Sequence, residues 1–197
     1  MNAEAPIQPS RVRVEDPRPG DAQAILDYWY RSPPAFLEGM GVDLDRLPAP
    51  EQLEARIEAK IRGAEGGTPP SDLLMIRCDA STIGFHIINE MVPGDGAIFH
   101  GHIFDPAFRR RGVAMTSYPL ACRVFLDRFD LRRMWFKTPA QNLGAIRVKE
   151  KLGIRRVGEE RVDFGVIRAG TRAVCFEWTR EELAQFEARG VGALDGS

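Results

Sequence analysis

Three short apolar runs follow one another in the middle of the chain, and they constrain the fold more than any other feature. They cover residues 73–78, 83–89 and 97–104, and turn-rich pieces separate them. Runs of this length are typical of strands, because a helix with one buried face needs a longer periodic segment. Short connections join consecutive strands as hairpins, so the sequence predicts three antiparallel strands at the centre of a sheet.

Helical and strand patterns flank these three runs on both sides. Further strands are expected over 11–15, 134–137, 155–166 and 172–179, and helices over 21–31, from Pro50 to Gly66, over 111–130 and over 145–152. This order predicts an α/β (α+β) fold, in which a mixed, mostly antiparallel central sheet of about six to seven strands has helices on both faces. Pro119 removes a hydrogen bond inside the expected helix 111–130, so we expect that helix to be bent or interrupted near Met115.

A length of 197 residues suits one domain with a sizeable core. We expect that single domain to span residues 11–189. Residues 1–10 contain two prolines and little apolar content, and residues 190–197 are rich in small residues. Both ends are therefore expected to be loose tails, 1–10 flexible and 190–197 frayed.

The composition excludes several classes of partner. The chain has 27 Lys and Arg against 28 Asp and Glu, a net charge of −1, which argues against a nucleic-acid or anionic-membrane partner. Three scattered cysteines and three histidines show neither disulfide nor metal-site spacing, so no metal is expected. No secretory leader or long apolar run is apparent, and we expect a cytoplasmic protein.

A strand, a short turn and a helix start follow one another between Ile98 and Met115. Three arginines, Arg109 to Arg111, precede Gly112 where the helix is expected to begin. The first turn of a helix presents unpaired amide groups, and a glycine there allows a phosphate to approach closely. The pattern therefore favours phosphate binding, with a solvated surface junction as the alternative.

Two motifs carry a resemblance to a known family. Arg109-x-x-Gly112-x-Ala114 resembles the Q/R-x-x-G-x-G/A signature of the GNAT superfamily of acyl-CoA-dependent N-acetyltransferases. The segment from Asn142 to Ile154 is similar to the N-x-x-A/S … L-G-F segment of that family. The order of strands and helices agrees over about residues 11–179. The resemblance implies a GNAT-like fold with acetyl-CoA as cosubstrate.

The resemblance also implies where the cosubstrate would lie. The strands at 97–104 and 132–138 would splay apart, with the pantetheine arm between them and the pyrophosphate on the amides of 110–115. Asn142 would touch the cosubstrate from the second helix, a role that does not conflict with capping that helix. The implied cosubstrate-binding residues are Ile103, Phe104, Arg109, Arg110, Arg111, Gly112, Val113, Ala114, Met115 and Asn142.

His100 and His102 are candidates for the general base. They are two residues apart on one expected strand, so their side chains share a face, and an imidazole can remove a proton near neutral pH. His100 matches one of the two histidines that arylalkylamine relatives place on this strand, whereas Ile98 occupies the other position and His102 would substitute for it. Alternatively both histidines are packed polar residues, and Glu90 is a rival base.

Lys149 occupies the register at which many relatives have a tyrosine that protonates the departing thiolate. It is therefore a candidate acid, although a solvent-facing lysine is the ordinary alternative. Tyr28, Trp29 and Phe36 are expected to wall the acceptor side, or else to belong to the core. Nearby acidic residues would attract a cationic amine or would simply be solvated: Glu38, Asp43 and Asp45.

These features predict an N-acetyltransferase that transfers an acetyl group from acetyl-CoA to a primary amine by direct attack, with a strand histidine as base. The acceptor would be a small molecule or a protein or peptide N-terminus, and we allow for a homodimer. The alternative is a non-catalytic acyl-CoA-binding sensor or scaffold with the same fold. The missing tyrosine favours this alternative, whereas His100 and His102 favour the enzyme.

Overall fold

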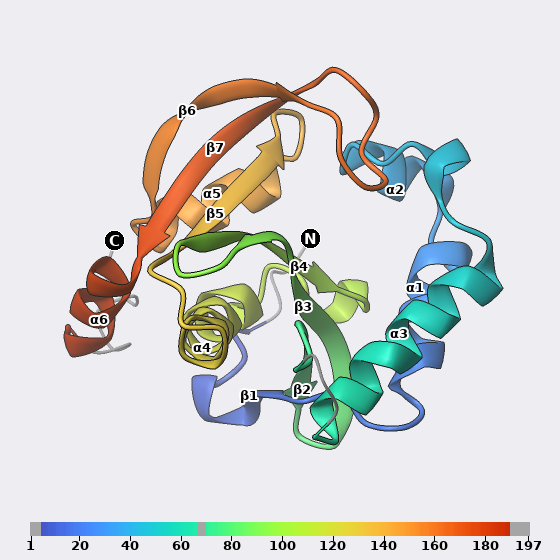
Figure 1. The fold of residues 1–197 in the computed structure, drawn as a ribbon, viewed down its shortest axis with the longest axis horizontal. Helices are drawn as coiled ribbons and strands as arrows, with labels where there is room; N and C mark the ends of the chain where they lie inside the picture. Colours follow the sequence, from blue (N-terminus) through green and yellow to red (C-terminus); the bar gives the residue numbers. More distant parts are fainter. Residues whose placement is uncertain (1–4, 67–69, 190–197) are drawn as a thin grey trace.

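One seven-stranded sheet organises the molecule, which is described here from a computed structural model that covers residues 5–66 and 70–189 (Figure 1). The strands are β1 (Val12–Glu15), β2 (Leu73–Cys78), β3 (Ser81–Val92), β4 (Gly96–Ile103), β5 (Arg133–Pro139), β6 (Arg155–Val162) and β7 (Thr171–Thr179). The helices are α1 (Asp21–Arg31), α2 (Pro34–Gly39), α3 (Pro50–Ala64), α4 (Val113–Arg128), α5 (Leu143–Lys151) and α6 (Arg180–Ala188). The strand order is β1-β2-β3-β4-β5-β7-β6, and every pair except β4 with β5 is antiparallel. The predicted fold class is confirmed.

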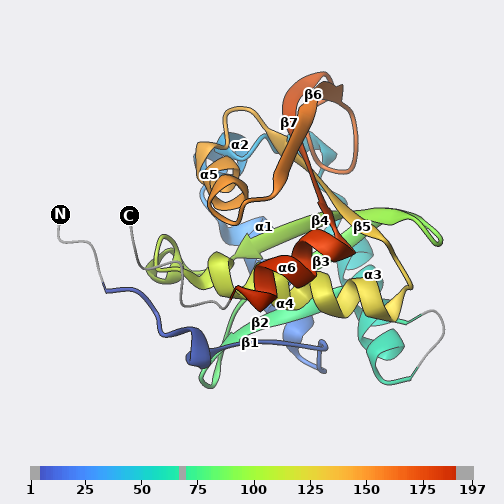
Figure 2. The same cartoon turned by 90° about the vertical axis from the view of Figure 1, so that its left-hand side faces the viewer.

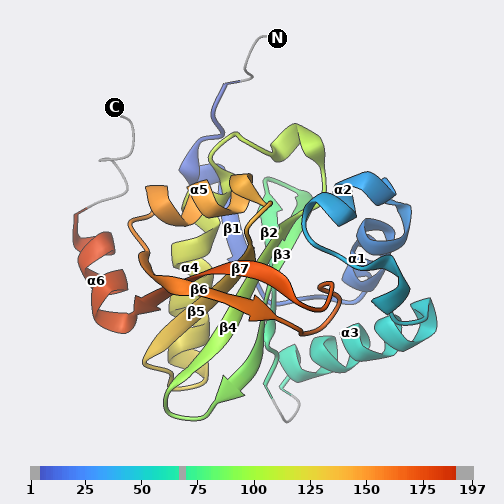
Figure 3. The same ribbon diagram turned by 90° about the horizontal axis from the view of Figure 1, so that it is seen from above.

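Helices cover both faces of the sheet (Figures 2 and 3). On one face, α1 and α3 pack Ile25 and Ile57 against Phe85 of β3. On the other face, α4 places Phe125 in a larger core with Phe99 of β4 and Phe136 of β5. Successive side chains of a strand point to opposite faces, so β2 and β3 supply side chains to both cores.

The sheet divides between its two parallel strands. β4 and β5 pair only where Gly96 to Ile98 lie opposite Arg133 to Trp135. Beyond that point β4 continues beside β3 as far as Ile103, and β5 continues beside β7 as far as Pro139. The facing edges of β4 and β5 therefore separate, as the expected splay requires (Figure 1).

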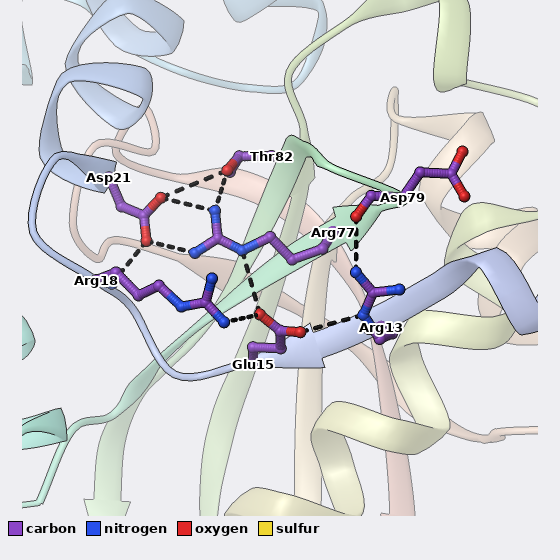
Figure 4. Close-up of polar contacts among 7 residues, drawn as sticks. All are labelled: Arg13, Glu15, Arg18, Asp21, Arg77, Asp79 and Thr82. Carbon is purple, nitrogen blue, oxygen red and sulfur yellow. Dashed lines mark hydrogen bonds and ion pairs between the residues drawn. The ribbon is translucent and has the colours of Figure 1, made fainter.

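A buried ion pair fixes the start of α1 against the sheet (Figure 4). The guanidinium of Arg77 on β2 donates to both carboxylate oxygens of Asp21, at 2.9 and 2.8 Å, and both residues are buried. The Asp21 carboxylate also accepts from the backbone N–H of Arg18 at 2.7 Å. Charged groups stay in an interior only when they are paired and hydrogen-bonded, so this network defines where α1 begins.

Two helices were not predicted, α2 and α6, although Thr179 and Glu182 form a reciprocal capping box at the start of α6. α4 is one continuous helix with Pro119 in its interior, so it is not interrupted, and a bend near Met115 stays a prediction.

The expected loose N-terminal segment is partly docked. Ile7 is buried beside Val12 and Val113, and its backbone N–H donates to the carbonyl of Arg111. Residues 1–4 and the C-terminal segment 190–197 were also expected to be loose, and both lie outside the described residues.

Candidate active site

The backbone before α4 makes the turn that the glycine motif suggests. Gly112 is the N-cap residue with φ +86°, and Arg110 also has a positive φ of 60°. The left-handed region favours glycine, and a Cβ at Gly112 would meet no atom within 4 Å, so the space in front of the helix start is open. The first two amides of α4, those of Val113 and Ala114, have no carbonyl one turn earlier in the helix to donate to. The amide of Met115 donates to the carbonyl of Gly112 at 2.9 Å.

The three arginines of the motif have different surroundings. Arg109 donates to the carbonyls of Ile103 and Phe104 at 2.8–3.1 Å and lies 3.9 Å from the Phe36 ring centroid. Arg111 donates to the carbonyls of Ala5 and Ala107. Two of the three side chains thus hold backbone carbonyls, and pairing of the arginines with a phosphate stays a prediction.

Arg110 differs from its two neighbours. Its side chain is exposed and makes no ion pair with any described residue. It lies next to the open helix start, so it is the arginine of the motif that remains available to an anion.

A cavity of about 310 Å³ passes through the division of the sheet. Trp29 and Ile57 line it from the helices of one face, whereas Tyr118 and Lys149 line it from α4 and α5 on the other. Such a passage connects the two faces at the point where β4 and β5 separate. It is therefore the place where a cosubstrate on one face would meet an acceptor on the other.

His100 and His102 both line this cavity. The Nδ1 atom of His102 lies 3.0 Å from the hydroxyl of Tyr28, and its ring stacks on Phe85 with 4.7 Å between centroids. The Nε2 atom of His100 is buried and has no hydrogen-bond partner. Burial lowers the pKa of His100 to about 4 and that of His102 to about 3, so both imidazoles are neutral at pH 7.

The other two proton acceptors near this strand lie elsewhere. His86 is buried on the opposite face of the sheet between Phe99 and Tyr118. Glu90 is exposed near the end of β3 with φ +47° and does not line the cavity. The structure does not bring Glu90 together with the histidines, and we do not retain it as a base.

Lys149 is buried, which corrects the solvent-facing alternative. It is 5% exposed, and its Nζ atom lies 5.4 and 5.8 Å from the ring centroids of Tyr118 and Phe136. It forms no ion pair with any residue of 5–66 or 70–189. Burial lowers its pKa to about 7, because no carboxylate compensates for the loss of water.

Asn142 caps α5, and its expected contact with the cosubstrate stays a prediction. Its side-chain oxygen accepts from the backbone N–H of Ala145 at 3.2 Å, which caps α5, and the residue also lines the cavity. Of the three aromatic candidates, Trp29 lines the cavity, whereas Tyr28 is buried behind His102 and Phe36 lies beneath Arg109.

Sequence reasoning missed other parts of the wall. Phe164 to Ile167, between β6 and β7, line the cavity, and so do Arg56 of α3 and Lys137 of β5. Nothing in the local sequence of these residues indicates a role, because they reach the cavity only through the tertiary fold. Tyr118 of α4 also lines the cavity, on the inner wall.

Two further findings apply to the described part of the chain. No helix there combines the length and the apolar character that crossing a bilayer requires. No three His, Cys, Asp or Glu side chains in that part gather as ligands for a metal ion.

The fold and cavity are those of an acyl-CoA-dependent acetyltransferase. The model of the acetyltransferase (GNAT) domain family matches residues 11–155. The protein therefore belongs to the GNAT family of N-acetyltransferases. No curated protein matches the sequence.

Solved structures show the same fold. Mycobacterium smegmatis RimJ in complex with CoA-disulfide is 19% identical, with a TM-score of 0.70, over 92% of this chain and 88% of RimJ. Vibrio cholerae spermidine N-acetyltransferase in complex with CoA and spermine is 14% identical, with a TM-score of 0.69, over 89% of this chain and 99% of that protein. A putative acetyltransferase from T. thermophilus is 22% identical, with a TM-score of 0.64, over the full length of both chains.

Proposed function

We propose that the protein transfers an acetyl group from acetyl-CoA directly to a primary amine in the cytoplasm. The observation that carries this proposal is the cavity through the divided sheet, which has His100 on the β4 edge and Lys149 on α5. A proton acceptor and a proton donor thus lie on one passage between the two faces.

The residues present fit acetyl-CoA. The helix start at Gly112 is open and presents amides and the positive end of the helix dipole, which suit a pyrophosphate. Arg110 adds a positive charge there. The separated edges of β4 and β5 leave backbone groups for the pantetheine arm, and Asn142 borders the same cavity.

Transfer requires a neutral amine, and His100 would supply the base. Its buried Nε2 has no partner, so in the tautomer protonated at Nδ1 it offers a lone pair to the acceptor's proton, directly or through a water. His102, held by Tyr28, would keep the adjacent wall rigid. The amine nitrogen then bonds to the thioester carbon while the carbon–sulfur bond breaks.

Lys149 would return a proton to the thiolate. An ammonium with a pKa lowered to about 7 gives up its proton more readily than an ordinary lysine. Its positive charge also stabilises negative charge that develops in a site with little water. Lys149 would therefore take the place of the tyrosine that many relatives have in this register.

The acceptor class is left between a small-molecule amine and a protein or peptide N-terminus. The similar solved structures include both kinds, a spermidine N-acetyltransferase and a ribosomal L7/L12 alpha-N-protein acetyltransferase. The non-catalytic alternative, an acyl-CoA sensor, is disfavoured because a sensor needs neither the unpaired Nε2 of His100 nor a buried, unpaired Lys149.

Calorimetry with acetyl-CoA, followed by thiol release with a panel of amines and peptides, tests the proposal. We expect binding without any amine and thiol release only when an accepted amine is present. Binding without release from any amine would support the sensor, and no binding at millimolar acetyl-CoA would contradict both functions.

A further inference from the structure

The acceptor half of the cavity has mostly apolar walls. Its lining there is aliphatic and aromatic, contributed by α1, α3, the segment before α3 and the loop between β6 and β7, with Trp29, Leu53 and Phe164 among them. Apolar walls of this kind bind the body of a ligand by removing apolar surface from water.

The charges on the cavity are all of one sign. Four cationic side chains line it, Arg56, Lys60, Lys137 and Lys149, and no Asp or Glu from the described residues does. The carboxylates that the sequence suggested as amine attractants lie elsewhere: Glu38, Asp43 and Asp45 do not line this cavity.

Two of the four cations are neutralised and two are not. Lys60 pairs with Asp72 at 2.5 Å, and Lys137 pairs with Glu160 at 2.8 Å. Arg56 and Lys149 form no ion pair with a described residue. Arg56 is exposed on α3, on the acceptor side, whereas Lys149 is buried on α5.

This distribution is unsuited to a polycation. A polyamine would bring second and third ammonium groups to a wall that offers no carboxylate and on which Arg56 is already an uncompensated positive charge. A ligand with one amine, an apolar body and an anionic group at its far end fits better. Its body would contact the apolar wall, and its anion would pair with Arg56. It would enter with its amine toward His100.

We propose that the acceptor is a primary amine on an apolar body that ends in an anionic group, with Arg56 as the residue that selects the anion. This inference rests on the proposed acetyl transfer for its biological meaning. The binding preference that it predicts does not depend on turnover.

A matched series of ligands tests it. Para-(aminomethyl)benzoate, its carboxamide and para-xylylenediamine share one body and differ only in an anionic, neutral or cationic end, and spermidine adds a flexible polycation. Binding is measured by calorimetry, and kcat/KM by thiol release from acetyl-CoA. We expect the carboxylate to bind about fivefold more tightly than the carboxamide, and the carboxamide more tightly than the diamine by a similar factor. Differences of this size are typical of a partly exposed ion pair.

Arg56→Glu should reverse this order, so that the diamine exceeds the carboxylate. Arg62→Glu is the matched control, because Arg62 is an exposed arginine of the same helix that does not line the cavity, and it should leave the order unchanged. Equal affinity for the carboxylate, the carboxamide and the diamine would overturn the inference, and so would a higher affinity for the diamine or spermidine. An order of affinities that Arg56→Glu leaves unchanged would overturn it as well. If the ligands bind in the predicted order but no thiol is released from acetyl-CoA, the proposed acetyl transfer is contradicted and the preference for an anion is supported.

Discussion

Replacement of Lys149 by Met separates a catalytic role from a structural one. The pKa of Lys149 is lowered from 10.5 to about 7 by burial, and each unit corresponds to about 1.36 kcal/mol, so the folded state holds the charged form at a penalty of about 5 kcal/mol. Methionine has a similar unbranched stem and no charge. Lys149→Met should therefore make the protein more stable at pH 7, by as much as several kcal/mol.

The same substitution should make the enzyme slower. Loss of a positioned acid lowers kcat by about 10²–10⁴-fold, whereas improved packing alone would not. Thermal unfolding and thiol release at pH 7 measure the two effects on one sample. Lys151→Met, on the exposed side of the same helix, is the control and should change neither property appreciably.

Stability of the wild type adds an independent check on Lys149. The unfolded lysine holds its proton up to about pH 10.5 and the folded one only to about pH 7, so the unfolded state binds more protons between these values. Stability should therefore rise with pH across this range through Lys149, and Lys149→Met should lose that rise. Turnover of Lys149→Met equal to that of Lys151→Met would refute the assignment of the acid.

The remaining predictions concern the base, the helix start, the buried ion pair and the histidines. His100→Ala should lower kcat at neutral pH by about 10²-fold, and unchanged turnover in the thiol-release assay would remove His100 from the mechanism. Gly112→Val should weaken acetyl-CoA binding in calorimetry, because a β-branched side chain disfavours the positive φ that shapes the helix start, and unaltered affinity would place the pyrophosphate elsewhere. Asp21→Ala should destabilise the fold by about 3–5 kcal/mol in denaturant unfolding, because the buried Arg77 would keep only its longer ion pair with Glu15 at 3.6 Å, and a change under about 1 kcal/mol would contradict the role given to the pair of Arg77 and Asp21. Burial holds the pKa values of the three histidines at about 3 to 4, below the ordinary 6.5, so the unfolded state binds protons first and stability should fall as pH drops below about 6.5; constant stability down to about pH 4 would contradict their burial.

The sheet and the point at which it divides could be predicted because they depend on the local pattern of strands and motifs. The runs 73–78, 83–89 and 97–104 became adjacent strands, and the divergence of β4 from β5 follows the order that the motifs implied. α6 was missed although its capping box at Thr179 is visible in the sequence, because a short helix after a strand has little periodicity to detect.

The roles of individual side chains could not be predicted in the same way. Arg109 and Arg111 look like phosphate ligands in the sequence, yet their partners are carbonyls that the tertiary fold brings within reach. Lys149 looks like a surface residue of a polar helix, and only the packing of α5 beside Tyr118 and Phe136 reveals its burial. Side-chain burial of this kind depends on contacts between distant segments, which a local pattern does not contain.

Direct acetyl transfer is tested most directly by following an isotope-labelled acetyl group from acetyl-CoA by mass spectrometry. With para-(aminomethyl)benzoate or an accepted peptide, we expect the label on the amine nitrogen, one CoA thiol released for each labelled amine, and no label retained on the protein. Label retained on a cysteine of the protein as a transfer intermediate would contradict direct attack. Thiol release without a labelled amine would contradict acetyl transfer itself.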